Sequence, residues 1–484
     1  MNDIFLIFDA NFTTMIFDKN IFRAYDIRGK AISDKPQITE EFALQLGKAL
    51  GTYFLRRNMT NFACARDGRL TSESLQSALI QGLVSTGIQV TNLGLSPSPM
   101  FYFAVCQPEF DCGCVVTASH NPKDDNGFKI VSNGAHSVWG DELQKIYQLI
   151  LDQDYEVADT TLDVAQASVF DRYVSKLHTL LDLKRPLKVV LDTGNGIAGP
   201  FVDKIFNHPM IDLHVIFQDI DGNFPNHPAN PEKAANMMDL SKKVVELGAD
   251  IGFGFDGDAD RLGIVDQNGK FYTCDLLLMV LAEDFLSRNP GEVVIFDTKV
   301  SKVVENKIVE YGGKPFRYMT GHSLIEKQMH QDNIKFGGEI SGHYFFGENY
   351  YGFDDAFLGA LRFLSIFSTK EHAVSGFFDK LPHVFVTPEV RIDCADDHKF
   401  AVVEETIKNF ESQFSLKTLD GMFLEFNDHT WGVCRASNTA GQLTLRFESQ
   451  SKQDLFVVID LISDFLDTYD FLDVTAVREL KTLF

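Results

Sequence analysis

The sequence has few basic residues for its acidic content and no long apolar run. It contains 44 Lys and Arg against 68 Asp and Glu, so its formal net charge is −24. Nucleic-acid binding needs clustered Lys and Arg, and this charge argues against a nucleic-acid partner. No apolar stretch approaches the roughly 20 residues of a membrane span. The apolar N-terminal stretch has no basic residue before it and is interrupted by Asp9, which argues against a signal peptide. We expect a cytoplasmic protein with no membrane partner.

Cysteine is also scarce. The seven cysteines are odd in number and scattered, and only Cys112 and Cys114 lie close together. A zinc site built from cysteines would need a second pair at suitable spacing, and the sequence has none. Reduced thiols in a cytosolic protein are the better interpretation.

The composition is that of an ordinary globular protein, with 45% hydrophobic and 23% charged residues among 484. This length exceeds one core of about 100–200 residues, so we expect three or four domains. The stretches 61–69, 188–196 and 293–301 each contain an apolar run that ends in Asp, with a helical segment further along. This alternation predicts three α/β units. In the third unit, Ser323 is placed to cap a helix.

The last hundred residues follow another pattern. Segments 383–393 and 441–449 alternate apolar and polar residues, which is typical of half-buried antiparallel strands. Helical segments accompany them. We therefore expect a small α+β domain from about residue 383.

An aspartate triplet follows a predicted strand. Residues 251–255 alternate Gly with Ile or Phe, so the strand delivers Asp256 to its C-terminal end, where open α/β sheets bind ligands. Asp256, Asp258 and Asp260 place three carboxylates within five residues. Three negative charges this close repel one another unless a cation lies among them, and oxygen ligands suit Mg²⁺. A solvated acidic turn is the alternative interpretation.

A polar turn presents Ser119. An apolar run stops at Thr117, and Ser119 and His120 open a stretch of turn-forming chain. Three carboxylates do not fill an octahedral magnesium shell, and a phosphate on Ser119 would supply a further oxygen. On this stretch alone, a plain turn serine is the alternative.

A glycine-rich stretch carries groups that bind sugar hydroxyls and move protons. Glu339, Ser341 and His343 supply an acceptor, a hydroxyl and a group that titrates near neutrality. The alternative is a tight hairpin with a satisfied histidine.

A turn between two predicted strands offers a cradle for a dianionic phosphate. Arg435 supplies a fork of donors beside Ser437, Asn438 and Thr439, although a polar hairpin turn would look the same. Further cations that an anionic ligand needs lie in glycine-rich or strand-end segments: Arg23, Arg28, Lys129, Lys299 and His322.

Together these stretches resemble the α-D-phosphohexomutases. "TASHNP", "DGDADR", "GGEISGH" and "RASNT" occur in the order and spacing of that family, and "FRAYDIRG", "TGHSLI" and "GFDDA" fit as well. The resemblance covers almost the whole chain from about Phe22. It looks closest to the phosphomannomutase/phosphoglucomutase branch found in bacteria. Ala65 and Ala440 depart from the family's usual residues, and neither is an expected ligand.

The resemblance implies an α/β fold with four domains around a central cleft. Three related α/β domains with mixed sheets precede a C-terminal α+β domain. The expected boundaries are an N-terminal extension (1–20), domain 1 with the phosphoserine loop (21–170), domain 2 with the metal-binding loop (171–270), domain 3 with the sugar-binding loop (271–382) and domain 4 with the phosphate-binding loop (383–484).

The resemblance also implies a monomeric phosphohexomutase that acts on a small phosphosugar. It would interconvert hexose 1-phosphate and hexose 6-phosphate, with mannose and glucose, through a phosphoserine and a hexose 1,6-bisphosphate that also serves as activator. Ser119 would carry the phosphate and bind Mg²⁺ together with Asp256, Asp258 and Asp260. The other expected catalytic residues are His343, Lys129 and Arg261. The expected substrate-binding residues are Tyr25, Arg28, Lys299, His322, Glu339, Ser341, His343, Arg435, Ser437, Asn438 and Thr439.

Three other functions remain open. A phosphoglucosamine mutase of the same family shares the Ser-Gly-His motif. A phosphatase or mutase of the haloacid dehalogenase type would use Asp256 as nucleophile, but Asp260 stands where Thr or Val is expected. A phosphosugar-binding protein with a decayed site would lack catalytic groups, yet each type is present.

Overall fold

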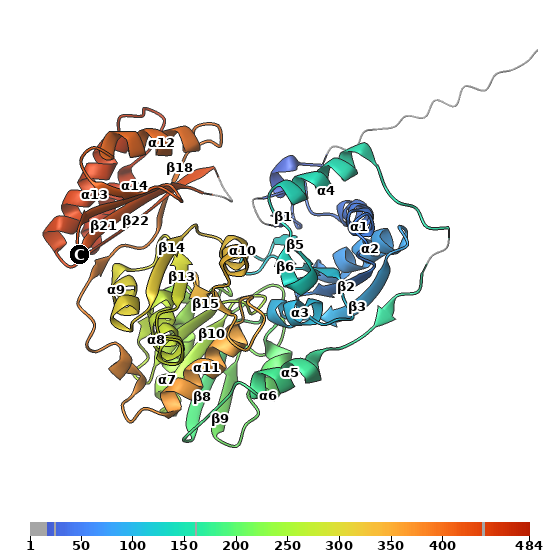
Figure 1. The fold of residues 1–484 in the computed structure, drawn as a ribbon, viewed down its shortest axis with the longest axis horizontal. Coiled ribbons are helices and arrows are strands. Elements are labelled where there is room, and N and C mark those ends of the chain that lie inside the picture. The colour runs from blue at the N-terminus through green and yellow to red at the C-terminus, as the bar shows by residue number, and fades with distance from the viewer. Residues whose placement is uncertain (1–16, 24–25, 160–161, 438–440) are drawn as a thin grey trace, which may run out of the picture.

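The computed structural model describes residues 17–23, 26–159, 162–437 and 441–484. Within these ranges the strands form four successive sheets (Figure 1). The first unit, blue to teal, and the fourth, red, lie on opposite sides of the green and yellow units. No helix in the described ranges is both long enough and apolar enough to cross a bilayer.

The first sheet is mixed. Its strands are β1 (Ile27–Lys30), β2 (Asn61–Arg66), β3 (Gln89–Leu95), β4 (Cys112–Val116), β5 (Asp125–Ser132), β6 (His136–Ser137) and β7 (Ala165–Gln166). They follow the order β1-β5-β4-β2-β3-β7, and β6 pairs with β5. The accompanying helices are α1 (Glu40–Leu55), α2 (Ser72–Val84), α3 (Ser98–Val105) and α4 (Asp141–Asp152). The β4–β5 connection carries Ser119.

The second sheet places the aspartate triplet. Its strands are β8 (Leu187–Asp192), β9 (Ile211–Ile216), β10 (Ile251–Phe255), β11 (Leu262–Asp266) and β12 (Phe271–Tyr272), in the order β12-β11-β10-β8-β9. The neighbouring helices are α5 (Phe170–His178), α6 (Gly199–Ile205) and α7 (Met238–Leu247). Strand β10 is fully buried and parallel to β8, so the triplet follows at the carboxyl edge of the parallel strands.

The third sheet carries the glycine-rich hairpin. Its strands are β13 (Val293–Asp297), β14 (Lys314–Tyr318), β15 (Phe336–Gly338) and β16 (Tyr344–Phe346), in the order β14-β13-β15-β16. The helices are α8 (Cys274–Arg288), α9 (Lys302–Glu310), α10 (His322–Asp332) and α11 (Ala356–Ser368). The prediction that Ser323 caps α10 is wrong. The helix begins at His322, so the N-cap is Gly321, two residues before Ser323, and its φ of 138° suits glycine.

The fourth sheet is antiparallel in every recorded pairing. Its strands are β17 (Phe385–Val386), β18 (Val390–Asp393), β19 (Ser415–Lys417), β20 (Met422–Asn427), β21 (Thr430–Ala436) and β22 (Gln442–Ser449). The helices are α12 (Lys399–Phe410), α13 (Lys452–Leu466) and α14 (Thr475–Glu479). The expected fold class, three α/β units with mixed sheets and a C-terminal α+β unit, is confirmed.

The first three units share one continuous apolar core. In this cluster, Phe103 of the first unit contacts Tyr173 at a centroid distance of 5.5 Å, and Phe255 contacts Phe357 at 5.1 Å. The fourth unit has an apolar cluster of its own. Polar contacts join it to the third unit, for example the 3.1 Å ion pair between Lys302 and Glu425. Because apolar burial dominates folding, the first three units support one another most strongly.

Candidate active site

The loop that carries Ser119 is held by its main chain. Ser119 is 1% exposed and has a left-handed φ of 50°, which costs a non-glycine residue about 1–3 kcal/mol. Arg69 holds the loop by donating hydrogen bonds to four carbonyl oxygens, those of Ser119 (2.7 Å), Asn121 (2.7 Å), Pro122 (2.8 Å) and Asp125 (3.0 Å). These bonds compensate the strain and hold the backbone that carries Ser119.

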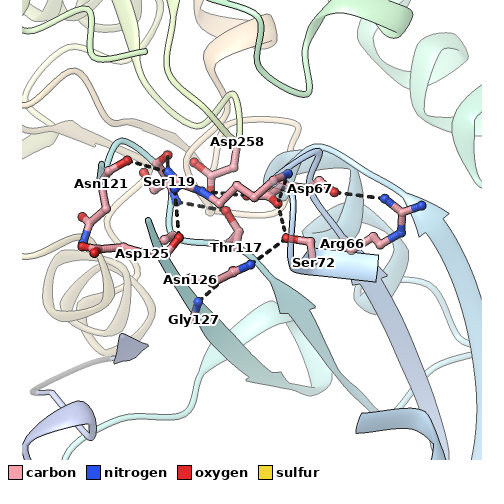
Figure 2. Close-up of polar contacts among 12 residues, drawn as sticks. Arg66, Asp67, Ser72, Thr117, Ser119, Asn121, Asp125, Asn126, Gly127 and Asp258 are labelled. Carbon is pink, nitrogen blue, oxygen red and sulfur yellow. Dashed lines mark hydrogen bonds and ion pairs between the residues drawn. The ribbon is translucent and has the colours of Figure 1, made fainter. Parts of the chain in front are cut away.

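Arg69 is itself fixed by a chain of polar contacts. Asp67 Oδ1 accepts the main-chain N–H of Arg69 at 2.9 Å and the hydroxyl of Ser72 at 2.5 Å. Figure 2 shows Asn126 donating to Ser72 beneath the loop, at 2.9 Å. No local pattern assigned a role to Arg69, because its loop partners lie 50 to 56 residues away. The one available signal was its place in the Asp-Gly-Arg turn after β2.

The three aspartates lie together after β10. All are fully buried, and one carboxylate oxygen of each lies within 4.8 Å of the other two. Ser119 Oγ donates to Asp256 Oδ2 at 2.7 Å. Among the described residues, Asp258 Oδ1 and Asp260 Oδ1 have no hydrogen-bond partner. Buried carboxylate oxygens left over in this way fit a hard divalent cation such as Mg²⁺.

Lys129, on β5, provides positive charge next to the triplet. Its Nζ donates to Asp258 Oδ2 at 2.6 Å and to Asp260 Oδ2 at 2.5 Å. Burial opposes the lysine charge, but these two carboxylates raise the pKa of Lys129 well above its ordinary value. Burial and the other carboxylates raise the pKa of Asp256. Lys129 is therefore a cation at neutral pH rather than a proton acceptor.

His343 lies between a carboxylate and a guanidinium. Its Nδ1 is 2.5 Å from Asp354 Oδ2, and its Nε2 accepts the Nε–H of Arg261 at 3.0 Å. Since arginine only donates, Nε2 carries no hydrogen and the ring proton faces Asp354. Burial lowers the pKa of His343 to about 4, so the ring is neutral at pH 7. His322 stacks on it with the centroids 5.3 Å apart.

Asp354 is the second residue that the sequence left without a role. Its motif, "GFDDA", resembles the family, but its contact with His343 joins two segments that no local pattern connects. Burial and Asp260 raise the pKa of Asp354 well above its ordinary value. Asp354 therefore holds a proton more readily than a free aspartate does, next to the Nδ1 of His343.

A cleft of about 750 Å³ collects most of the expected residues. Its lining includes Arg28, Ser119, Lys129, Asp260, Arg261, Lys299, His322, Glu339, Ser341, His343, Arg435 and Ser437. Asp256 and Asp258 are buried behind this lining. Tyr25, Asn438 and Thr439 lie outside the described residues. Segments from all four sheets thus meet at one cleft.

Polar contacts position the side chains of this lining. Arg28 forms a 2.5 Å ion pair with Asp26 and donates to Asn121 Oδ1 at 3.1 Å, next to Ser119. Glu339 lies at the turn between β15 and β16, and its Oε1 accepts the N–H of Gly321 at 2.7 Å. Burial raises the pKa of Glu339 to about 7. A carboxyl group that titrates near neutrality suits contacts with sugar hydroxyls.

The cleft gathers positive charge in an acidic chain. Lys299 lies 2.6 Å from Glu389, and Arg435 donates to Asp420 Oδ2 at 3.0 Å. Arg23, which the sequence suggested, also lines the cleft, and three more lining cations were not expected: Lys30, Lys233 and Arg391. Such a concentration of guanidinium and ammonium groups suits an anionic ligand that reaches from the first unit to the fourth.

Comparison with known proteins agrees with this geometry. Three models of the phosphoglucomutase/phosphomannomutase family match in order: α/β/α domain I at residues 19–156, domain II at 171–269 and domain III at 273–385. A phosphomannomutase/phosphoglucomutase of Pseudomonas aeruginosa is 39% identical over 437 residues, covering 90% of this chain and 93% of that protein. A phosphoglucomutase of Neisseria meningitidis is 37% identical, with 90% and 94% covered.

A solved structure agrees as well. The crystal structure of a phosphoglucomutase/phosphomannomutase family protein from Burkholderia thailandensis has a TM-score of 0.87 and 34% sequence identity, and the match covers 94% of this chain and 98% of that chain. The chain therefore belongs to the phosphoglucomutase/phosphomannomutase family, a bacterial branch of the α-D-phosphohexomutases, which are isomerases that transfer phosphate within one sugar.

Proposed function

We propose that this phosphohexomutase interconverts the 1-phosphates and 6-phosphates of mannose and of glucose by way of phosphorylated Ser119. The observation that carries the proposal is the 2.7 Å hydrogen bond from Ser119 Oγ to Asp256, at the wall of a cleft rich in cations. A plain turn serine needs neither a buried carboxylate triplet beside it nor four bonds from Arg69 to its loop.

Two phosphoryl transfers complete the proposed reaction. In the first, the bond between phosphorus and Ser119 Oγ breaks while the free sugar hydroxyl bonds to phosphorus, which gives a hexose 1,6-bisphosphate. The sugar then turns within the cleft, and its other phosphate passes to Ser119 Oγ. A protein-held phosphate is needed because the two sugar oxygens lie far apart on the ring, and positioning and charge supply most of the acceleration.

The attacking hydroxyl must lose a proton, and we assign this proton to His343. The ring is neutral and its Nε2 carries a lone pair, which Arg261 occupies at 3.0 Å. A guanidinium forms stronger bonds to phosphate than to an imidazole nitrogen. Arg261 would therefore turn to the phosphosugar and free Nε2 to accept the proton. Lys129 remains protonated and balances charge.

Asp256, Asp258 and Asp260 would hold Mg²⁺, with the phosphate on Ser119 as a further ligand. The unpartnered oxygens Asp258 Oδ1 and Asp260 Oδ1 support this assignment. When bound, the ion would supply positive charge that neutralises the phosphoryl oxygens.

The sugar would bind in two orientations within the same contacts. Glu339 and Ser341 would hold ring hydroxyls, and Arg435, Ser437, Asn438 and Thr439 would hold the phosphate that is not transferred. Tyr25, Arg28, Lys299 and His322 would complete the substrate contacts. A site that accepts both orientations should tolerate a change at C2, where mannose and glucose differ. The alternative, a phosphoglucosamine mutase, has less support, because the compared relatives are named for mannose and glucose.

The remaining parts of the proposal concern the setting of the enzyme. We infer a cytoplasmic monomer that does not bind nucleic acid, and the net charge of −24 supports the last point. Domain limits at residues 20, 170, 270 and 382 are part of the same proposal.

Intact-protein mass spectrometry tests the proposed function. After treatment with a hexose 1,6-bisphosphate, the chain should gain one phosphoryl group, mapped to Ser119 and stable to hydroxylamine. A hydroxylamine-labile phosphate on Asp256 would contradict the proposal and indicate the haloacid dehalogenase type. A chain that takes up no phosphate and shows no mutase activity would be a binding protein only.

A further inference from the structure

Three side chains that can bind a metal lie together outside the cleft. His136 on β6 and both Glu326 and His330 on α10 each offer one ligand atom, and the three atoms lie within 4.8 Å of one another. The two imidazole rings are in contact, with centroids 4.1 Å apart. The three residues are absent from the cleft lining. Strand β6 and helix α10 lie next to each other in Figure 1, where the first and third units meet.

Glu326 has an unused ligand atom. The residue is 5% exposed, and its Oε2 accepts the hydroxyl of Ser137 at 2.8 Å. Its Oε1 is buried and, within the described part of the chain, has no hydrogen-bond partner. A buried carboxylate oxygen in this state has lost its water without gaining a protein donor, which is unfavourable. A bound cation would satisfy it.

The two histidines are suited to complete such a site. Both are exposed, so an ion can reach the buried carboxylate from solvent. Glu326 and His330 are four residues apart on α10 and therefore share a face of the helix.

We propose that His136, Glu326 and His330 form a site for a divalent transition metal of the zinc type, separate from the aspartate triplet. Two imidazole nitrogens and one carboxylate oxygen suit Zn²⁺, whereas three carboxylates suit Mg²⁺. Such ligands lie about 2.0–2.2 Å from zinc, so small rotations of the exposed imidazoles close the site. Water occupies the remaining position.

An ion at this place joins two units that build the cleft. Strand β6 pairs with β5, which follows the Ser119 loop, and α10 begins at His322. Side-chain contacts between the β6 segment and α10 include the Ser137–Glu326 hydrogen bond, and Lys327 lying 4.5 Å from the centroid of the Trp139 ring. The metal therefore fixes His322 relative to the Ser119 loop without touching substrate.

Zinc binding to the full chain tests the proposal. The protein is kept in excess Mg²⁺, which saturates the triplet, and Zn²⁺ is titrated by calorimetry. We expect one Zn²⁺ per chain, with a rise in Tm. Glu326→Gln keeps an acceptor for Ser137 but loses the anionic ligand. Because changes to outer ligand partners alone cost about 10–100-fold, Glu326→Gln should lose at least about a hundredfold in Zn²⁺ affinity.

Two histidine variants complete the test. His136→Ala changes an exposed side chain, so it reports on the site even if Glu326→Gln unfolds, and it should lose Zn²⁺ affinity equally. His398→Ala is the matched control, because His398 is an exposed histidine of the fourth unit. This variant should bind Zn²⁺ with the same affinity as the wild type. Two results would overturn the proposal: no Zn²⁺ bound in excess Mg²⁺, or Zn²⁺ binding that both site variants retain.

Discussion

The ammonium nitrogen of Lys129 lies 2.5 Å from Oδ2 of Asp260, among the carboxylates that would hold a divalent ion. Three buried carboxylates without a cation would repel one another and would not all remain ionised. The lysine balances part of this charge before any metal binds. Among the residues that the structure describes, it leaves Oδ1 of Asp258 and of Asp260 without a hydrogen-bond partner, and these atoms would remain for the metal.

Removing one carboxylate should weaken the metal site. For Asp260→Asn we expect the Mg²⁺ concentration for half-maximal activity to rise by about tenfold or more, since a neutral amide is a poorer ligand for a hard cation. Chelation should abolish wild-type activity, and added Mg²⁺ should restore it. Asp239→Asn, on α7 where the side chain is 43% exposed, is the control and should leave the Mg²⁺ requirement unchanged. An unchanged requirement in Asp260→Asn would remove this residue from the metal site.

Ser119→Ala should abolish turnover and leave the fold intact. The loop is held through carbonyl oxygens, so the missing hydroxyl does not loosen it. We expect kcat to fall by roughly four orders of magnitude or more, because no other group can hold the phosphate. Ser74→Ala, at an exposed position of α2, should retain full activity. Circular dichroism checks the fold, and wild-type turnover by the Ser119 variant would refute the phosphoserine mechanism.

Arg69→Lys should slow the reaction without removing the positive charge. A lysine cannot donate to the four carbonyl oxygens that the guanidinium of Arg69 contacts, so the Ser119 loop loses its fixed geometry. We expect kcat to fall by about 10- to 100-fold, because misplaced reacting groups are costly. Arg66→Lys is the matched control: Arg66 pairs with Glu73, whose side chain is 78% exposed, and its replacement should change kcat little. Equal kcat values for the two variants would contradict the role of Arg69.

Asp355 should make stability depend on pH. It caps α11 and accepts hydrogen bonds from Tyr173 and Tyr350, and burial raises its pKa from 3.8 to about 6. The folded chain thus holds this proton more tightly than the unfolded chain. The carboxyl group favours folding below its unfolded pKa, and this contribution is lost as pH rises through about 6.

Asp355→Asn cannot ionise and should remove this pH dependence. Relative to wild type, its free energy of unfolding should rise by up to about 3 kcal/mol between about pH 4 and pH 7. Urea unfolding, followed by circular dichroism at several pH values, measures the difference. Asp182→Asn, where the side chain is 72% exposed, is the control. Parallel pH profiles for wild type and Asp355→Asn would show that Asp355 is not the titrating group.

Substrate discrimination between mannose 1-phosphate and glucose 1-phosphate should be small. The site must hold the ring in two orientations, so it cannot depend strongly on the hydroxyl at C2. We expect a kcat/KM ratio below about a thousand, which corresponds to about 4 kcal/mol. Glucosamine 6-phosphate, assayed in parallel, should be the poorest substrate. A preference for it would favour the phosphoglucosamine mutase alternative.

The sequence predicted those parts of the site that local patterns encode. A strand that ends in polar residues carries its own signal, so the Ser119 loop, the aspartate triplet and the hairpin of Glu339 were found without a structure. The alternation of elements likewise predicted the fold class. Arg69 and Asp354 were missed because their role comes from contacts with distant segments. His136 and His330 are separated by almost two hundred residues, and no periodicity connects them.

Local geometry also limited what could be predicted. Ser323 satisfied the pattern of a capping residue, but the N-cap lies two residues earlier, at Gly321, whose positive φ no residue preference at Ser323 reveals. Tyr25, Asn438 and Thr439 stay predictions, since they lie outside the described residues.

The support of the Ser119 loop has a consequence for the reaction cycle. Arg69 holds main-chain oxygens, and none of these bonds involves the Ser119 side chain, which would gain and lose phosphate in the proposed reaction. These hydrogen bonds therefore do not depend on whether Ser119 carries a phosphate. In the proposed reaction, both phosphoryl transfers would therefore start from the same backbone conformation of the Ser119 loop.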